Sequence, residues 1–115
     1  MLTGCRKGIV RRALAEAGPD AAEAAIDRLV ALFGTGRVVV ELIDHQLPTD
    51  TDTNDTLMAI GQRRGLRVVA TGNVHYARPG EARLAAAMAA VRARRSLVEL
   101  DGRLPPPTAF LRSGA

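Results

Sequence analysis

The chain has 115 residues, a length that predicts one small domain, and 47% of the residues are hydrophobic, enough to form a core. Much of that content is alanine and only 3% of the residues are aromatic, so we expect marginal stability and a chain that is part of something larger. The single cysteine, Cys5, excludes an intrachain disulfide and favours a cytoplasmic location. The longest apolar run, residues 84–91, is too short to cross a membrane.

Charge is unevenly distributed along the chain, whose formal net charge is +4. Residues 1–60 carry six Lys or Arg against nine Asp or Glu, a balance of −3, and residues 61–115 carry ten against three, a balance of +7. A basic half is typical of surfaces that face nucleic acid or an acidic partner. The basic residues are almost all arginine, and a solvated Arg-rich surface is the slightly favoured interpretation.

Two amphipathic helices are predicted at the start. Residues 8–17 place Ile9, Val10, Ala13, Leu14 and Ala17 on one face, with Arg11, Arg12 and Glu16 on the opposite, polar face. The Gly18-Pro19 pair ends that helix and begins the next, which runs to about Phe33. The buried stripe of the second helix is predicted to be Ala22, Ala25, Ile26, Leu29, Val30 and Phe33.

A strand, a helix and a second strand follow. Residues 37–43 form the first predicted strand and are β-branched and apolar at their centre. Residues 66–71 form the second, and within it residues 68–71 are small or apolar without polar alternation, which indicates a strand buried on both faces. Between them we predict a polar loop over residues 49–55 and a helix over residues 56–64, capped by Asn54 or Asp55. Short connections predict a right-handed βαβ unit with parallel strands. His45 and His75 then follow strand ends at the same edge.

The last third predicts a helix over residues 79–95, with Leu84, Ala87, Met88 and Val91 on one face. Residues 96–103 are predicted to be irregular or to form a short turn, and residues 105–107, three prolines, to be extended. The fold class is therefore α/β. Because two strands cannot form an independent α/β sheet, we interpret the chain as the middle of a longer one or as a truncated copy.

The pattern Asp50-x-Asp52-x-Asn54 is similar to the start of a calcium loop, but Asp55 stands where that loop requires glycine. An Asx-rich entry to a helix is the favoured interpretation. Other candidate metal ligands are Cys5, His45, Asn73 and His75. They are dispersed in the sequence, so a site would need ligands from elsewhere.

Three sequence blocks occur in order: LTGCRKG at residues 2–8, VELIDHQLP at residues 40–48 and VATGNVHY at residues 69–76. Together they resemble the PHP (polymerase and histidinol phosphatase) domain of bacterial C-family DNA polymerases, the polymerase III alpha group. Residues 92–97 and 110–113 continue the resemblance, and the details are more similar to the error-prone, damage-inducible branch than to the main replicase.

The resemblance implies part of a (β/α)7 barrel, with residues 1–78 as the C-terminal part of a PHP domain. Residues 79–115 would be its last helix and a Pro-rich segment leading towards the polymerase domain. It also implies a zinc- or manganese-type metal cluster, which some members use as a 3′–5′ exonuclease. Cys5, Asn73 and His75 match family ligand positions, although Asn73 replaces an aspartate. An uncharged amide there weakens the case for both metal binding and hydrolysis.

We therefore predict a fragment of an error-prone DNA polymerase that serves DNA synthesis and damage-tolerant repair. The parent would use Mg²⁺, act on DNA in the cytoplasm and include the remainder of the polymerase chain as this segment's partner. We expect the fragment itself to be inactive. Two alternatives stay open: a free-standing PHP-type metallophosphoesterase or 3′–5′ exonuclease, and a non-enzymatic Arg-rich module that binds nucleic acid.

Overall fold

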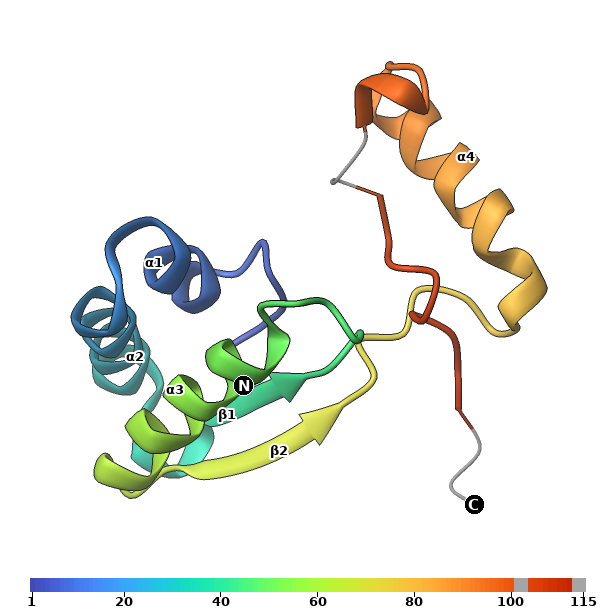
Figure 1. Ribbon diagram of the computed structural model, residues 1–115. Coiled ribbons are helices and arrows are strands. Elements are labelled where there is room, and N and C mark those ends of the chain that lie inside the picture. Colours follow the sequence, from blue (N-terminus) through green and yellow to red (C-terminus); the bar gives the residue numbers. More distant parts are fainter. Residues whose placement is uncertain (101–103, 113–115) are drawn as a thin grey trace. The chain divides into compact units, whose positions relative to one another are not determined.

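The computed structural model describes residues 1–100 and 104–112, and it divides the chain into two compact units, Met1–Thr71 and Gly72–Ala115. Each unit is described by itself. The helices are α1 (Ile9–Ala17), α2 (Pro19–Phe33), α3 (Asp50–Arg63) and α4 (Ala82–Ala93), the strands are β1 (Val39–Ile43) and β2 (Arg67–Thr71), and short 3-10 turns lie at Thr35–Arg37, Pro79–Glu81 and Val98–Leu100 (Figure 1).

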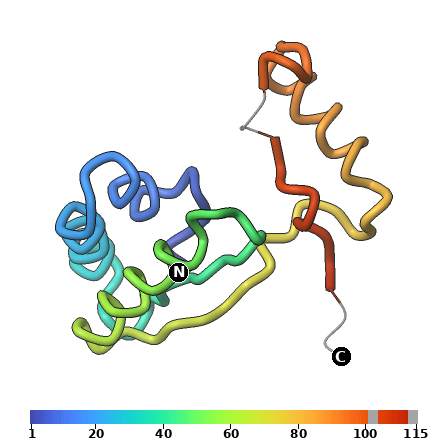
Figure 2. Tube along the Cα trace, viewed as in Figure 1, coloured from blue at the N-terminus to red at the C-terminus, as the bar shows by residue number. Residues whose placement is uncertain are grey.

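The first unit contains the predicted βαβ arrangement. β1 and β2 are parallel, with Val39 opposite Arg67 and Ile43 opposite Thr71, and α3 connects them. At the other edge of β1, Leu2 forms an isolated parallel bridge with Val39, so the start of the chain runs beside this strand (Figure 2). The parallel α/β arrangement is thus confirmed, and the residues described contain a two-stranded sheet, with no barrel among them.

One face of the sheet and the first three helices enclose the core. The buried cluster consists of Val10, Ala22, Ala25, Ile26, Leu29, Val38, Val40, Leu57, Ile60 and Leu66. Gly61 lets α3 approach the sheet closely, because a Cβ atom there would lie 2.9 Å from Cγ2 of Val68 and 3.3 Å from Cγ2 of Val40. The predicted core positions of α1 and α2 are right, except that Ile9 (46% exposed), Ala17 and Phe33 (45% exposed) lie at the surface.

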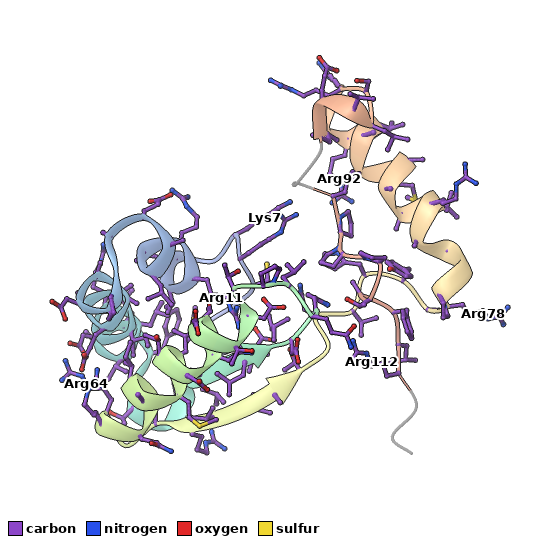
Figure 3. All side chains as sticks on the ribbon, viewed as in Figure 1. Lys7, Arg11, Arg64, Arg78, Arg92 and Arg112 are labelled. Atoms are coloured by element: carbon purple, nitrogen blue, oxygen red, sulfur yellow. The ribbon has the colours of Figure 1, made fainter. Side chains whose placement is uncertain are left out.

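Ion pairs join α2 and α3 on the outside of the first unit. Glu23 contacts Arg63 and Arg64 at 2.8 Å each, and Asp27 contacts Arg64 at 2.6 Å. Arg64 lies beside α2 in Figure 3. The four side chains are between 21% and 55% exposed, so these pairs add modest stability that salt reduces.

Two sequence predictions for this unit are wrong. Helix α3 begins at Asp50 rather than Thr56, so residues 50–55 are helical and neither Asn54 nor Asp55 is a cap. The physical reason is that carboxylates in the first turn favour a helix start, and Asp50 and Asn54 also bond to other segments. Strand β2 is not buried on both faces, because α3 covers only one, and Arg67, Val69 and Ala70 are exposed.

The second unit contains α4 and a short parallel bridge between Tyr76 and Phe110. The Tyr76 hydroxyl donates to the carbonyl oxygen of Pro106 at 2.9 Å. The large apolar side chains of α4 share one face as predicted, and they are exposed there: Leu84 by 62%, Met88 by 61% and Val91 by 78%. Part of the predicted irregular segment, residues 101–103, lies outside the described residues. Across the described chain, no helix is both long and apolar enough to span a bilayer.

Candidate functional site

The carboxyl ends of β1 and β2 lie at one edge of the sheet, as the parallel register requires. After β1 the chain turns through residues 44–49, and Asp50 fixes this turn. One carboxylate oxygen of Asp50, Oδ2, accepts from the backbone N–H of His45 at 2.8 Å and from that of Leu47 at 3.1 Å. His45 is buried, with 7% exposed, so the first histidine of the predicted rim lies inside the first unit.

The outer edge of β1 is the side of the strand that faces away from β2. Along this edge, side chains form the hydrogen bonds that a neighbouring strand would otherwise provide. Thr3 Oγ1 accepts from the N–H of Glu41 at 2.9 Å. Asn54 pairs with both backbone groups of Ile43: its Oδ1 accepts from the N–H at 3.2 Å, and its Nδ2 donates to the carbonyl oxygen at 3.0 Å. A strand edge normally needs a second strand to satisfy these groups. Here a threonine and an asparagine satisfy them.

Arg11 also forms hydrogen bonds at this edge. The sequence prediction that Arg11 lies on the polar face of α1 is wrong, because its side chain is buried. It is only 9% exposed, and Nη2 donates to Asn54 Oδ1 at 2.8 Å and to the Glu41 carbonyl oxygen at 3.5 Å (Figure 3). Burial lowers the pKa of the Arg11 guanidinium, while the nearby Asp50 and Glu41 carboxylates oppose that shift. Of the buried side-chain nitrogen and oxygen atoms in the described residues, only Arg11 Nε lacks a hydrogen-bond partner.

Glu41 is a buried carboxylate in the middle of β1, with 7% exposed. The hydroxyl of Thr71, at the end of β2, donates to Glu41 Oε1 at 2.6 Å. The Arg11 cation is the charge that compensates this carboxylate and Asp50. The two buried carboxylates, Glu41 and Asp50, therefore already have partners within the protein.

Cys5 lies in the turn between Thr3 and α1. It is half-buried and free, and its carbonyl oxygen accepts from the N–H of Gly8 at 2.7 Å. A side chain at Gly8 would bring a Cβ atom within 2.9 Å of the Thr3 carbonyl oxygen, so glycine is required for this tight turn. The turn holds Cys5 near Arg11.

Asn73 and His75 belong to the second unit. Asn73 has a φ of 40°, in the left-handed region that asparagine tolerates better than most residues, and it is half-buried. His75 is exposed, and its backbone N–H donates to the Ala109 carbonyl oxygen at 2.8 Å. The structure thus places one of the three predicted metal ligands, Cys5, in the first unit and the other two in the second.

The described residues do not fit a metal centre by themselves. No group of three or more His, Cys, Asp or Glu side chains in residues 1–100 and 104–112 could hold an ion. A structural zinc site needs four ligands, and a catalytic one needs three with an open position. Cys5 and His75 supply two of suitable type, and the amide of Asn73 is a poor third because it carries no charge.

Comparison with curated proteins shows that the chain is similar to part of several DNA polymerases. Each of them is named as an error-prone DNA polymerase. The chain is 55% identical over 116 residues to the one from Cutibacterium acnes, 51% identical over 116 residues to the one from Mycolicibacterium paratuberculosis and 50% identical over 115 residues to the one from Mycobacterium tuberculosis. These matches cover 99–100% of this chain and 10–11% of each relative. No family model matches the chain.

Sequence reasoning missed the polar cluster at the β1 edge, formed by Thr3, Arg11, Glu41 and Asn54. One feature of the sequence could have indicated this cluster. Glu41 interrupts an otherwise apolar strand, and a carboxylate in such a position needs a partner, because burying an unpaired charge is very costly. Nothing in the helical periodicity identified Arg11 as that compensating cation.

Proposed function

We propose that this chain is a segment of an error-prone DNA polymerase and lies in the PHP domain of that enzyme. The observation that carries the proposal is similarity along the whole chain, at 50–55% identity, to polymerases about ten times as long. In this proposal residues 1–78 form the C-terminal part of the PHP domain. Residues 79–115 contribute its last helix and the Pro-rich segment that leads towards the polymerase domain.

The architecture of the first unit supports the assignment. A PHP barrel consists of parallel strands connected by helices, and β1, α3 and β2 form one such repeat. The bridge between Leu2 and Val39 adds a short third parallel segment beside β1. Further strands of the parent would close the barrel, and they would also cover the face of β2 that α3 leaves exposed.

The role we assign to this segment is structural. Cys5, Asn73 and His75 would occupy ligand positions of the PHP metal cluster, and the remaining ligands would come from other parts of the parent. Glu41 and Asp50, the buried carboxylates among the described residues, are held by Thr71, by two backbone N–H groups and by the charge of Arg11. They are therefore poorly suited to bind an ion instead.

In the parent, DNA would be the substrate and the remainder of the polymerase chain the partner of this segment, in the cytoplasm. Polymerases of this kind add nucleotides with two Mg²⁺ ions held by paired carboxylates. We assign that chemistry, and the error-prone DNA synthesis that the relatives' names state, to parts of the parent outside these 115 residues.

The two alternative functions have less support. A free-standing metallophosphoesterase requires a metal centre, and the described residues supply no three-ligand group. A nucleic-acid-binding module requires arginines that converge on one surface. In the second unit Arg83 and Arg92 are nine residues apart on α4, which places them on opposite sides of the helix, and Arg78 and Arg92 lie at opposite ends of α4 (Figure 3).

Activity assays on the purified chain test the structural role. With Mg²⁺, Mn²⁺ or Zn²⁺ supplied, we expect neither extension of a primed template nor removal of 3′ nucleotides. A metal-dependent exonuclease activity that His75→Ala abolishes and Arg78→Ala preserves would overturn the proposal. That result would favour a self-sufficient PHP enzyme.

A further inference from the structure

Two short segments of the chain share a local pattern, a threonine and a glycine followed by a polar residue. They are Thr3-Gly4-Cys5, which we call the Cys5 turn, and Thr71-Gly72-Asn73, which we call the Asn73 turn. The backbone bends in both, with positive φ angles of 89° at Gly4 and 40° at Asn73. Each turn therefore starts from a threonine that belongs to the first unit.

Glu41, in the middle of β1, bonds to both of these threonines. Its backbone N–H donates to Oγ1 of Thr3 at 2.9 Å, and its Oε1 accepts from the hydroxyl of Thr71 at 2.6 Å. The second distance is typical of a hydroxyl that donates to a charged carboxylate, a stronger bond than one between neutral groups. Thr3 and Glu41 are buried, with 3% and 7% exposed, so water competes little with these bonds.

Arg11 supports Glu41 in this arrangement. Its Nη2 donates to the Glu41 carbonyl oxygen at 3.5 Å, and its positive charge compensates the Glu41 carboxylate. A buried carboxylate without a compensating cation is costly, so Arg11 makes the short bond between Glu41 and Thr71 possible. The start of the chain, α1 and the end of β2 are thus connected through one residue of β1.

We propose that Glu41 is a positioning residue, which holds the starting points of the Cys5 turn and the Asn73 turn. Two residues of chain span at most about 7 Å, so Cys5 and Asn73 each lie within that distance of a threonine that Glu41 fixes. Glu41 holds the Cys5 turn through its backbone and the Asn73 turn through its side chain, so each turn is fixed independently of the other. Only the value of Cys5 and Asn73 as ligand positions rests on the proposed function.

Two substitutions, each of which removes one hydroxyl, test the two anchors separately. Thr71→Val removes the donor to Glu41 and keeps a β-branched side chain in β2. We expect the amide order parameters of Gly72 and Asn73, measured by NMR relaxation, to fall from about 0.85 towards about 0.6, while the rate at which Cys5 reacts with a thiol reagent stays unchanged. Thr3→Val removes the acceptor of the Glu41 N–H, so Cys5 should react about fivefold faster while the order parameters of the Asn73 turn stay unchanged.

Conservative variants provide the controls, and far-UV circular dichroism verifies that each variant keeps the fold. Thr71→Ser and Thr3→Ser keep the hydroxyl and should match the unaltered chain in both measurements. Glu41→Gln weakens the bond to Thr71 from the other side, so it should lower the same order parameters by less and leave the reaction of Cys5 unchanged.

Equal changes at both turns in either valine variant would show a general loosening of the fold and overturn the proposal. Unchanged order parameters at Gly72 in both Thr71→Val and Glu41→Gln would overturn it as well. These measurements need neither a metal ion nor an enzymatic activity. The positioning role of Glu41 can therefore fail while the proposed function holds, and the assays of primer extension and 3′ nucleotide removal can overturn the proposed function while the positioning role holds.

Discussion

Asn54→Ala tests whether side chains truly replace a strand at the outer edge of β1. The Asn54 amide makes three hydrogen bonds: with the N–H of Ile43 at 3.2 Å, with the carbonyl oxygen of Ile43 at 3.0 Å and with Nη2 of Arg11 at 2.8 Å. Alanine removes all three. Two backbone groups and a buried cation then lose their partner together.

The expected loss of stability follows from these contacts. A buried polar group left unsatisfied costs about 1–3 kcal/mol, and a hydrogen bond from a charged donor contributes about 1.5–3 kcal/mol. Alanine is the better helix former and returns about 0.6 kcal/mol in α3. The total cost is the sum of these contributions for the two backbone groups and Arg11, less the gain in helix propensity. Because Asn54 is only half-buried, water can reach part of the site, so the expected cost lies at the lower end of this total. We expect the free energy of unfolding to fall by about 3 kcal/mol.

Urea unfolding followed by circular dichroism measures this change. For a slope of about 1–3 kcal/mol per molar, the midpoint should fall by about 1 M or more. Asp55→Ala is the matched control, because Asp55 is the next residue of α3, is exposed and gains similar helix propensity. If the free energies of unfolding of the two variants differ by less than about 0.5 kcal/mol, the hydrogen bonds of Asn54 do not stabilise the edge of β1, and the reasoning fails.

Three further predictions follow from particular contacts. Gly61→Ala should cost about 1–3 kcal/mol in urea unfolding because its Cβ would overlap a valine of β2, whereas Gly80→Ala, with nothing within 4 Å, should be neutral. The hydrogen bond from Arg63 lowers the pKa of Glu23, so this group stabilises the fold above the ordinary glutamate pKa of about 4.3 and loses that effect as pH falls through its lower folded pKa. Glu23→Gln should therefore lower the urea midpoint at pH 7 and leave it unchanged near pH 2; an equal change at both would contradict the ion pair. Asn73→Asp restores the carboxylate of the family position but no other ligand, so the variant should remain inactive as an exonuclease, and metal-dependent activity in it would show that one carboxylate completes the site.

The periodicity of the sequence was sufficient for most elements of the fold. Helices α1 and α2 and both strands lie where the apolar spacing and the Gly18-Pro19 stop predict them, with bounds that differ by two residues or fewer. Short connections correctly predicted that the strands are parallel. These features depend on local sequence, which is why the sequence alone reveals them.

Features that depend on distant residues could not be predicted in the same way. The start of α3 depends on Asp50 and Asn54, which bond to the turn after β1 and to β1 itself. Arg11 is charged and was assigned to the polar face, yet partners 30 and 43 residues away in the sequence make its burial possible. The exposure of β2 depends on how many strands the sheet contains, which the composition of β2 does not reveal.

The candidate ligands illustrate the same limit. The resemblance to a family identified Cys5, Asn73 and His75 by their positions in the sequence alone. A metal centre, however, is defined by the distances between side chains in space. In the structure these residues fall in two separately described units, so their role as ligands remains a prediction. The polar cluster at β1, by contrast, is defined by hydrogen bonds within one unit.

The genomic DNA on both sides of the coding segment provides the most direct test of the central claim, that this chain is a segment of an error-prone polymerase. We expect the reading frame to continue in both directions, or to resume after a disruption, with sequence similar to the parts of the relatives that these 115 residues do not cover. Flanking DNA that encodes unrelated proteins, with a dedicated promoter and stop codon around this segment, would contradict the claim.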